Sequence, residues 1–193
     1  MVQLTGFNNI NVAVFISGTG SNLKALIKFY KTKKYPIHIK LIISDNSKAK
    51  GLKYGNIFKI KKKTFNFKKR YLAEKNLLVE LEKNNIQLIC LAGFMKILSK
   101  NFIKKFKGKI LNIHPSLLPN YKGLNTHQRV LQNNEKYSGC TVHLVNSKLD
   151  SGKIILQSKI KIYKKETPKS LATKILKEEH KLYPKAILKL FNL

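Results

Sequence analysis

The chain has no tryptophan, two cysteines and nine acidic side chains among its 193 residues. The two cysteines, Cys90 and Cys140, each lie in a strand-like run, so we interpret them as buried packing residues of a protein in a reducing compartment. No apolar run approaches the roughly 20 residues of a membrane-spanning helix. The first residues lack the basic start and apolar segment of a secretion signal. These absences predict a cytoplasmic globular protein that does not enter a membrane.

Lysine dominates the charge of the chain. Its 39 basic and 9 acidic side chains give a formal net charge of +30. Such an excess is typical of proteins that bind a polyanion such as RNA. Only Arg70 and Arg129 are arginines, however. Proteins that bind nucleic acids use the bidentate guanidinium group of arginine to contact phosphates and bases. The lysines are also spread along the whole chain beside abundant asparagine and isoleucine, and all three residues have AT-rich codons. We therefore favour biased codon usage over a nucleic-acid partner, although a positive field would still attract anionic small substrates.

The length and the 43% hydrophobic content indicate one globular domain over residues 1–193. Apolar runs of strand length alternate with segments of helical periodicity, which predicts an α/β fold with a mostly parallel central sheet and helices on both faces. The expected strands are residues 11–16, 37–43, 57–60, 87–92, 109–113, 140–145 and 154–162. The expected helices are residues 23–34, a short one ending near Gly55, 70–83 with Tyr71, Leu77, Leu78 and Leu81 on its apolar stripe, a short one from about Thr126, and a long one from Thr167 that Pro184 kinks or breaks.

Ligands of such sheets bind beyond the carboxyl ends of the strands, where residues 17–22, 93–98 and 114–126 are expected. The first of these loops reads Ser17-Gly-Thr-Gly-Ser-Asn22. Its glycines would let the backbone approach a ligand, and the helix that follows offers free N–H groups to an anion. It lacks the third glycine of a dinucleotide fingerprint and the lysine of a Walker loop. Phosphate binding and an ordinary strand-to-helix turn with Ser21 as N-cap both remain open.

Asn112 and His114 are two residues apart in an expected strand that Pro115 ends, so their side chains share one face at its carboxyl edge. The amide of Asn112 can donate a hydrogen bond to an oxyanion, and His114 can act as general acid or, when charged, as an electrostatic stabiliser. A nearby Asp150 would raise the pKa of His114 by pairing with its charged form. These groups suit acyl transfer without a covalent intermediate. In the alternative interpretation, Asn112 and His114 satisfy loop backbone and Asp150 caps a turn.

Other chemistries find less support. The remaining histidines have no zinc-ligand spacing with a cysteine or carboxylate, so we expect no metal site; they are His38, His127, His143 and His180. No Gly-x-Ser-x-Gly elbow is present, which argues against a serine nucleophile.

Six segments in a fixed order carry a family resemblance over about residues 11–184. They are Ile16-Ser-Gly-Thr-Gly-Ser-Asn22, Leu91-Ala-Gly-Phe-Met-Lys-Ile-Leu98, Leu111-Asn-Ile-His-Pro-Ser-Leu-Leu-Pro119, Tyr121-Lys-Gly123, Gly139-Cys-Thr-Val-His143 and Leu149-Asp-Ser-Gly152. In this order and spacing the chain resembles the phosphoribosylglycinamide formyltransferases, also called glycinamide ribonucleotide transformylases.

The resemblance implies a Rossmann-like sheet and transfer of a formyl group from the co-substrate 10-formyltetrahydrofolate to the amine of 5'-phosphoribosylglycinamide in purine synthesis. It implies Asn112, His114 and Asp150 as the catalytic set. By position it implies ribonucleotide contacts at Gly20, Ser21, Asn22 and Glu179. The implied folate contacts are Lys68, Met95, Lys96, Ile97, Leu98, Asn112, Asn146, Ser147, Lys148, Leu149 and Asp150.

The chain departs from the family pattern at Asn125, where close relatives often have histidine, and at Lys96, where arginine is common. Two other enzyme families that use formyltetrahydrofolate are alternatives. Methionyl-tRNA formyltransferases usually carry a C-terminal domain, and formyltetrahydrofolate hydrolases usually carry an N-terminal one; we expect neither here. A non-enzymatic RNA-binding protein is the alternative from another class, motivated by the charge. We expect a monomer or a weak homodimer.

Overall fold

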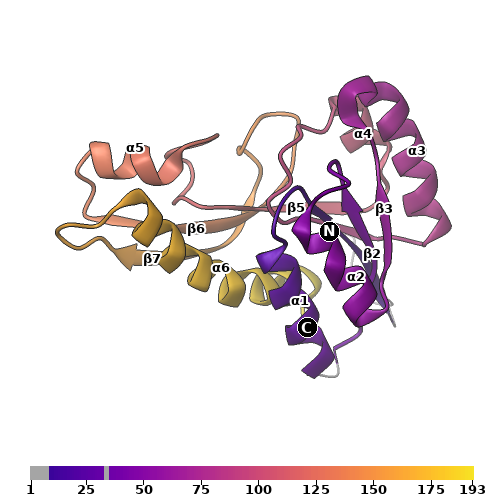
Figure 1. Ribbon diagram of the computed structural model, residues 1–193, viewed down its shortest axis with the longest axis horizontal. Helices are drawn as coiled ribbons and strands as arrows, with labels where there is room; N and C mark the ends of the chain where they lie inside the picture. The colour runs from indigo at the N-terminus through magenta and orange to yellow at the C-terminus, as the bar shows by residue number, and fades with distance from the viewer. Residues whose placement is uncertain (1–8, 33–34) are drawn as a thin grey trace. The chain divides into compact units, whose positions relative to one another are not determined.

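The structure, a computed structural model, describes residues 9–32 and 35–193. It consists of two compact units, one up to Leu111 together with Leu193, and one from Asn112 to Asn192. Strand β5 (Lys109–His114) begins in the first unit and ends in the second. The strand order is β3-β2-β1-β4-β5-β6-β7, a mostly parallel sheet with helices between the strands, which confirms the expected α/β class (Figure 1). Among the described residues, no helix has the length and apolar character needed to span a membrane.

The first unit is built on parallel strands. Strand β1 pairs with β2 on one side and with β4 on the other, and β2 also pairs with β3. All residues of β1 except Asn11 are buried, as its uninterrupted apolar sequence predicts for a sheet covered on both faces. The strands are β1 (Ile10–Ile16), β2 (Ile37–Ser44), β3 (Lys61–Thr64) and β4 (Leu88–Leu91). The helices are α1 (Ser21–Thr32), α2 (Lys53–Phe58), α3 (Arg70–Lys83) and α4 (Lys100–Lys105).

The third strand was predicted in the wrong place. The expected strand 57–60 overlaps the end of α2, which continues past Gly55 and stops where Lys59 adopts a left-handed conformation with φ of 55°. The aromatic rings of Tyr54 and Phe58, one helical turn apart, have centroids 6.2 Å apart and pack as a helical pair. The true strand β3 is lysine-rich and wholly exposed, so no apolar pattern marks it.

Helix α3 has the predicted bounds, and its buried face matches the prediction in part. The side chains of Leu77 and Leu81 are buried as expected, whereas Tyr71 is 71% exposed and does not belong to the buried stripe. A charged residue, Glu74, is buried instead. Its carboxylate accepts hydrogen bonds from the N–H and the hydroxyl of Ser99, at 2.7 and 2.5 Å. Ser99 is the N-cap of α4, a helix that the sequence pattern did not predict.

The second unit is formed by an antiparallel strand pair and two helices. Strands β6 (Tyr137–Leu144) and β7 (Ile154–Lys161) pair along their length, and helix α6 (Pro168–Phe191) packs on both, as Figure 1 shows. A short helix, α5 (Thr126–Gln132), begins at the predicted Thr126 and packs on α6.

Helix α6 continues through Pro184, so of the predicted kink or break, the break is wrong. The helix begins with a capping box in which Thr167 and Ser170 bond each other's backbone N–H groups. A proline inside a helix costs about 3 kcal/mol. Burial of one apolar face offsets this cost, because most helical stability comes from tertiary packing. The buried apolar residues of α6 are Leu171, Ile175, Leu182, Tyr183, Pro184, Ala186 and Ile187.

Gly139 permits the close approach of β6 and β7. A Cβ atom at this position would overlap the carbonyl oxygen of Ser158, a backbone atom that cannot move aside without disturbing the ladder. We expect Gly139→Ala to lower the free energy of unfolding by about 1–3 kcal/mol, the usual range for overpacking, in urea titrations followed by circular dichroism. Gly18→Ala is the matched control, because a Cβ atom there would meet no atom within 4 Å. An equal stability of the two variants would contradict this account.

Candidate active site

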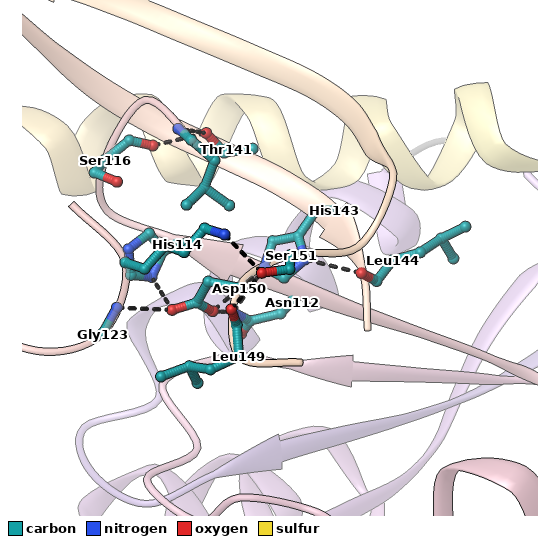
Figure 2. A network of polar contacts seen from close by, with 12 residues as sticks. Asn112, His114, Ser116, Gly123, Thr141, His143, Leu144, Leu149, Asp150 and Ser151 are labelled. Atoms are coloured by element: carbon teal, nitrogen blue, oxygen red, sulfur yellow. Dashed lines mark hydrogen bonds and ion pairs between the residues drawn. The ribbon is translucent and has the colours of Figure 1, made fainter. Parts of the chain in front are cut away.

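The end of β5 presents a carboxamide and an imidazole on the same face, as the alternation of a strand predicts. Asn112 and His114 come from this strand, and Pro115 follows directly after it. The His114 side chain is 6% exposed. A third group, Asp150, comes from the turn between β6 and β7, and its side chain is 8% exposed. Figure 2 shows these three side chains converging on one point.

The carboxylate of Asp150 lies at the centre of the cluster. Its Oδ2 atom accepts a hydrogen bond of 2.9 Å from the N–H of Gly123 and lies 3.4 Å from Nδ1 of His114. Its Oδ1 atom accepts a hydrogen bond of 3.4 Å from the amide of Asn112 and lies 3.6 Å from Nε2 of His143. Asp150 itself has a φ of 45°, in the left-handed region that non-glycine residues rarely occupy. One buried carboxylate therefore contacts the side chains of Asn112, His114 and His143.

His143 belongs to this cluster, although sequence reasoning assigned it no role. Its Nδ1 donates to the carbonyl oxygen of Leu144 at 2.9 Å. Its Nε2 lies 3.2 Å from the amide nitrogen of Asn112 and 3.6 Å from Oδ1 of Asp150. The amide of Asn112 therefore contacts both His143 and Asp150. The signal that could have found His143 is its place at the end of the segment Gly139-Cys-Thr-Val-His143.

The His114 ring has one nitrogen directed at a backbone carbonyl and the other at the carboxylate. Its Nε2 donates to the carbonyl oxygen of Tyr121 at 2.8 Å. Burial lowers the pKa of His114 below its ordinary value, and this effect outweighs the Tyr121 carbonyl and the charge of Asp150, which both raise the pKa. The expectation that Asp150 would leave His114 with a raised pKa is therefore wrong in its net direction. Asp150 acts in the expected sense, but desolvation of the ring is stronger.

Asp150 remains ionised at neutral pH. Burial alone would raise the pKa of its carboxyl, but the His143 ring, the Gly123 N–H and His114 together hold the pKa below the ordinary value. The resting cluster at neutral pH therefore contains an anionic Asp150 and a neutral His114 whose proton is on Nε2.

The loop after β5 is fastened to β6 and closes over His114. The hydroxyl of Thr141 donates to the carbonyl of Ser116 at 2.7 Å and accepts from the N–H of Leu118 at 3.1 Å. Further along, Tyr121, Gly123 and Asn125 have φ values of 56°, 78° and 56°. Asparagine tolerates this left-handed conformation better than most residues, which suits it to position 125.

The remaining predicted residues are distributed between the two units. In the second unit, Asn146 and Leu149 lie in the same turn as Asp150, together with Ser147 and Lys148, and the amide oxygen of Asn146 accepts from the N–H of Lys148 at 2.9 Å. Glu179 is buried in α6.

In the first unit, the residues predicted to bind the ribonucleotide form the start of α1. Gly20 has a φ of 69° and lies just before the helix. Its carbonyl accepts a hydrogen bond from the N–H of Lys24, as the carbonyl of an N-cap residue does. Ser21 is therefore the first helical residue and not the N-cap. Asn22 is buried, and a Cβ atom on Gly20 would lie 2.8 Å from the Cα of Gly51. Glycine is required at this position for both reasons.

The residues predicted to bind folate in the first unit follow β4. Met95 and Ile97 are 64% and 67% exposed, whereas Leu98 is buried. Exposed apolar side chains at adjacent alternate positions suit contact with an apolar ligand. Lys96 pairs with Asp45 at 3.8 Å, and Lys68 is exposed in a short 3-10 turn, Phe67–Lys69. Within residues 9–32 and 35–193, no three histidine, cysteine, aspartate or glutamate side chains form a group that could hold a metal ion.

Comparison with known proteins finds a consistent set of relatives. The family model described as "Formyl transferase" matches residues 10–187. The chain is 41% identical over 179 residues to the trifunctional purine biosynthetic protein adenosine-3 of Bos taurus, which covers 91% of this chain and 18% of that protein. It is 36% identical over 181 residues to the phosphoribosylglycinamide formyltransferase of Escherichia coli (strain K12), covering 92% of this chain and 85% of that enzyme. The chain thus spans less than a fifth of the trifunctional relatives but most of the bacterial one.

Solved structures agree with these relatives. The phosphoribosylglycinamide formyltransferase of Brucella melitensis superposes with a TM-score of 0.89 at 41% identity, covering 95% of both chains. The glycinamide ribonucleotide transformylase 1 of Symbiobacterium toebii gives a TM-score of 0.90 at 34% identity, covering 97% of this chain and 89% of the other.

Burial and the charge of Asp150 act in opposite directions on the pKa of His114, and removing the charge separates the two effects. The carboxylate favours the protonated ring, so Asp150→Asn should lower the pKa of His114 further below its ordinary value. The measurement is an NMR titration of the histidine ring signals. Glu166→Gln is the control, because Glu166 pairs with Lys174 and does not contact the cluster. A raised or unchanged pKa of His114 in Asp150→Asn would show that the carboxylate does not act on this ring.

Proposed function

Because the chain belongs to the formyl transferase family and, within it, to the phosphoribosylglycinamide formyltransferases, we propose that it transfers the formyl group of 10-formyltetrahydrofolate to the amine of 5'-phosphoribosylglycinamide. The reaction is a step of de novo purine biosynthesis, and we propose a cytoplasmic enzyme in which residues 1–193 act as one catalytic domain. The observation that carries the proposal is the convergence of Asn112, His114 and Asp150. A carboxamide, an imidazole and a buried carboxylate suit acyl transfer without a covalent intermediate.

In the proposed mechanism the substrate amine attacks the formyl carbon, and a new C–N bond forms while charge develops on the formyl oxygen. The bond between that carbon and N10 of the folate then breaks, and the proton lost by the amine goes to N10. No bond to the enzyme forms at any stage. The protein's task is therefore to stabilise the oxyanion and to carry one proton.

His114 would stabilise the oxyanion through its Nε2–H group. In the resting cluster this group donates to the carbonyl of Tyr121. The formyl oxygen must therefore replace that carbonyl, which requires the loop around Tyr121 to move when substrate binds. A developing oxyanion is a stronger acceptor than a neutral carbonyl, so the exchange favours the transition state over the resting enzyme.

Asp150 would stabilise the positive charge that appears on His114 if the ring takes up the proton of the amine. The carboxylate faces Nδ1, the nitrogen that is unprotonated in the resting ring. The amide of Asn112 donates to Asp150 and lies 3.2 Å from Nε2 of His143, so it would have to turn from these partners to donate to the oxyanion. Asp150 would thus orient the His114 ring and stabilise its positive charge. A water molecule would carry the proton to N10 of the folate.

Substrate contacts complete the proposal. Residues 20–22 would bind the ribonucleotide phosphate, since glycine-rich turns before a helix expose N–H groups to an anion. Glu179 would accept a hydrogen bond from the glycinamide part. The folate would contact Lys68, residues 95–98 and residues 146–150, where the exposed side chains of Met95 and Ile97 suit an aromatic ring system.

The proposal is tested by incubating the purified protein with 5'-phosphoribosylglycinamide and 10-formyltetrahydrofolate and following the release of tetrahydrofolate. We expect release that depends on both substrates. Release that occurs equally without the ribonucleotide would indicate a hydrolase, and the absence of release would contradict the proposed function.

His114→Ala should lower kcat by about 10²–10⁴-fold, the usual range for removal of a group that exchanges a proton with the substrate. Its fold should persist, which circular dichroism and thermal unfolding can check. The matched control is His38→Ala, an exposed histidine of β2 in the first unit, which should retain wild-type turnover. Wild-type turnover in His114→Ala would reject the proposed role of this ring.

The pH dependence of kcat/KM should also respond to Asp150. If protonation of His114 inactivates the resting enzyme, activity falls on the acidic side as pH drops through the pKa of His114, which burial has already lowered. Asp150→Asn removes an effect that raises this pKa, so the acidic limb should move to lower pH while the maximal rate decreases. A limb that stays in place, or that moves to higher pH, would remove His114 as the titrating group.

A further inference from the structure

The first unit contains a hydrogen-bond network at the carboxyl ends of three parallel strands. Its centre is Ser17, the residue that follows β1. The hydroxyl of Ser17 donates to Oδ1 of Asp45, one residue beyond β2, at 2.5 Å. The same oxygen accepts a hydrogen bond from the N–H of Met95, in the loop after β4, at 2.8 Å. One small side chain thus joins the loops that follow β1, β2 and β4.

Backbone and charge contacts strengthen this junction. The N–H of Ser17 donates to the carbonyl of Gly93 at 3.1 Å, so Ser17 holds the 93–98 loop at two points two residues apart. Oδ2 of Asp45, the carboxylate oxygen not bonded to Ser17, lies 3.8 Å from Nζ of Lys96. The Asp45 side chain is 9% exposed, so its charge is largely removed from water and depends on these partners.

We propose that Ser17 and Asp45 are positioning residues for folate binding, because they hold the main chain of residues 93–98 in the shape that receives the folate. Neither residue need touch the substrate. The inference rests on the proposed function for the identity of the ligand, since residues 95–98 are the proposed folate contacts.

The network also joins the two proposed substrate loops within the first unit. Ser17 is the first residue of the segment 17–22, which leads into the proposed ribonucleotide contacts. If that segment moved on binding the ribonucleotide, the hydrogen bond to Oγ of Ser17 would transmit the movement to the main chain of Met95. A hydroxyl serves this purpose because it donates and accepts at once, whereas alanine does neither.

Four variants separate hydrogen bonding, charge and simple packing. Ser17→Ala removes the hydroxyl, and Ser17→Thr keeps it. Asp45→Asn keeps an oxygen acceptor for Ser17 but removes the charge opposite Lys96. Ser47→Ala is the control, because Ser47 is an exposed serine of the same loop as Asp45.

The first measurement is hydrogen exchange at the backbone amide of Met95 in the unliganded protein, which reports the network whatever the ligand is. We expect exchange at least about 10-fold faster in Ser17→Ala than in the wild type, near wild-type exchange in Ser17→Thr, and no change in Ser47→Ala. Unchanged exchange in Ser17→Ala would overturn the positioning role.

The second measurement is steady-state kinetics with 10-formyltetrahydrofolate and 5'-phosphoribosylglycinamide. In Ser17→Ala we expect the KM for the folate to rise about 10-fold and kcat to change less than about 3-fold, because ground-state binding is lost and the catalytic cluster is untouched. Asp45→Asn should give a smaller rise and Ser17→Thr should restore the wild-type KM. Faster exchange at Met95 with an unchanged folate KM would overturn the link to folate binding.

The two proposals fail in different ways. A wild-type protein that transfers no formyl group would refute the proposed function, and the exchange rates would still decide whether Ser17 positions the loop. A wild-type protein that is active, with Ser17→Ala equal to it in both measurements, would refute only the positioning role.

Discussion

A single buried carboxylate, that of Asp150, is the interaction on which the candidate active site depends. This carboxylate accepts hydrogen bonds from the Gly123 N–H at 2.9 Å and the Asn112 amide at 3.4 Å. Ring nitrogens of His114 and His143 lie 3.4 and 3.6 Å from it. A charge this far from water is tolerated only when donors surround it. The same contacts fix the strand end, the loop that follows it and the turn that carries Asp150. Catalytic geometry and local stability therefore share one set of contacts.

Burial and charge act in opposite directions on the two titrating groups. Desolvation dominates at His114 and lowers its pKa, whereas the surrounding donors and rings outweigh desolvation at Asp150 and hold its pKa below the ordinary value. In the resting enzyme at neutral pH, Asp150 is consequently an anion and the His114 ring beside it is neutral, so the two do not form an ion pair. This arrangement favours a charge that appears on the ring only during the reaction, because the carboxylate is already in position to stabilise it.

Local patterns predicted much of the molecule, and tertiary relations account for the rest. The alternation of side chains in a strand was enough to put Asn112 and His114 on one face, and the apolar runs identified most strands. Strand β3 was missed because its lysines are exposed and carry no apolar signal. His143 was missed because its role comes from a contact with Asn112, 31 residues away, which no local pattern encodes. Pro184 does not end α6, because the packing of this helix outweighs a local preference.

The proton positions in the cluster test this account most directly, and ring nitrogen-15 NMR of histidine-labelled protein at neutral pH can observe them. The account predicts that His114 is neutral with its proton on Nε2, which donates to the carbonyl of Tyr121, and that its Nδ1, which faces Asp150, carries no proton. A His114 proton on Nδ1 at neutral pH would make this ring a donor to Asp150 and leave its Nε2 without a proton for the Tyr121 carbonyl. That result would contradict the arrangement from which the catalytic roles are argued.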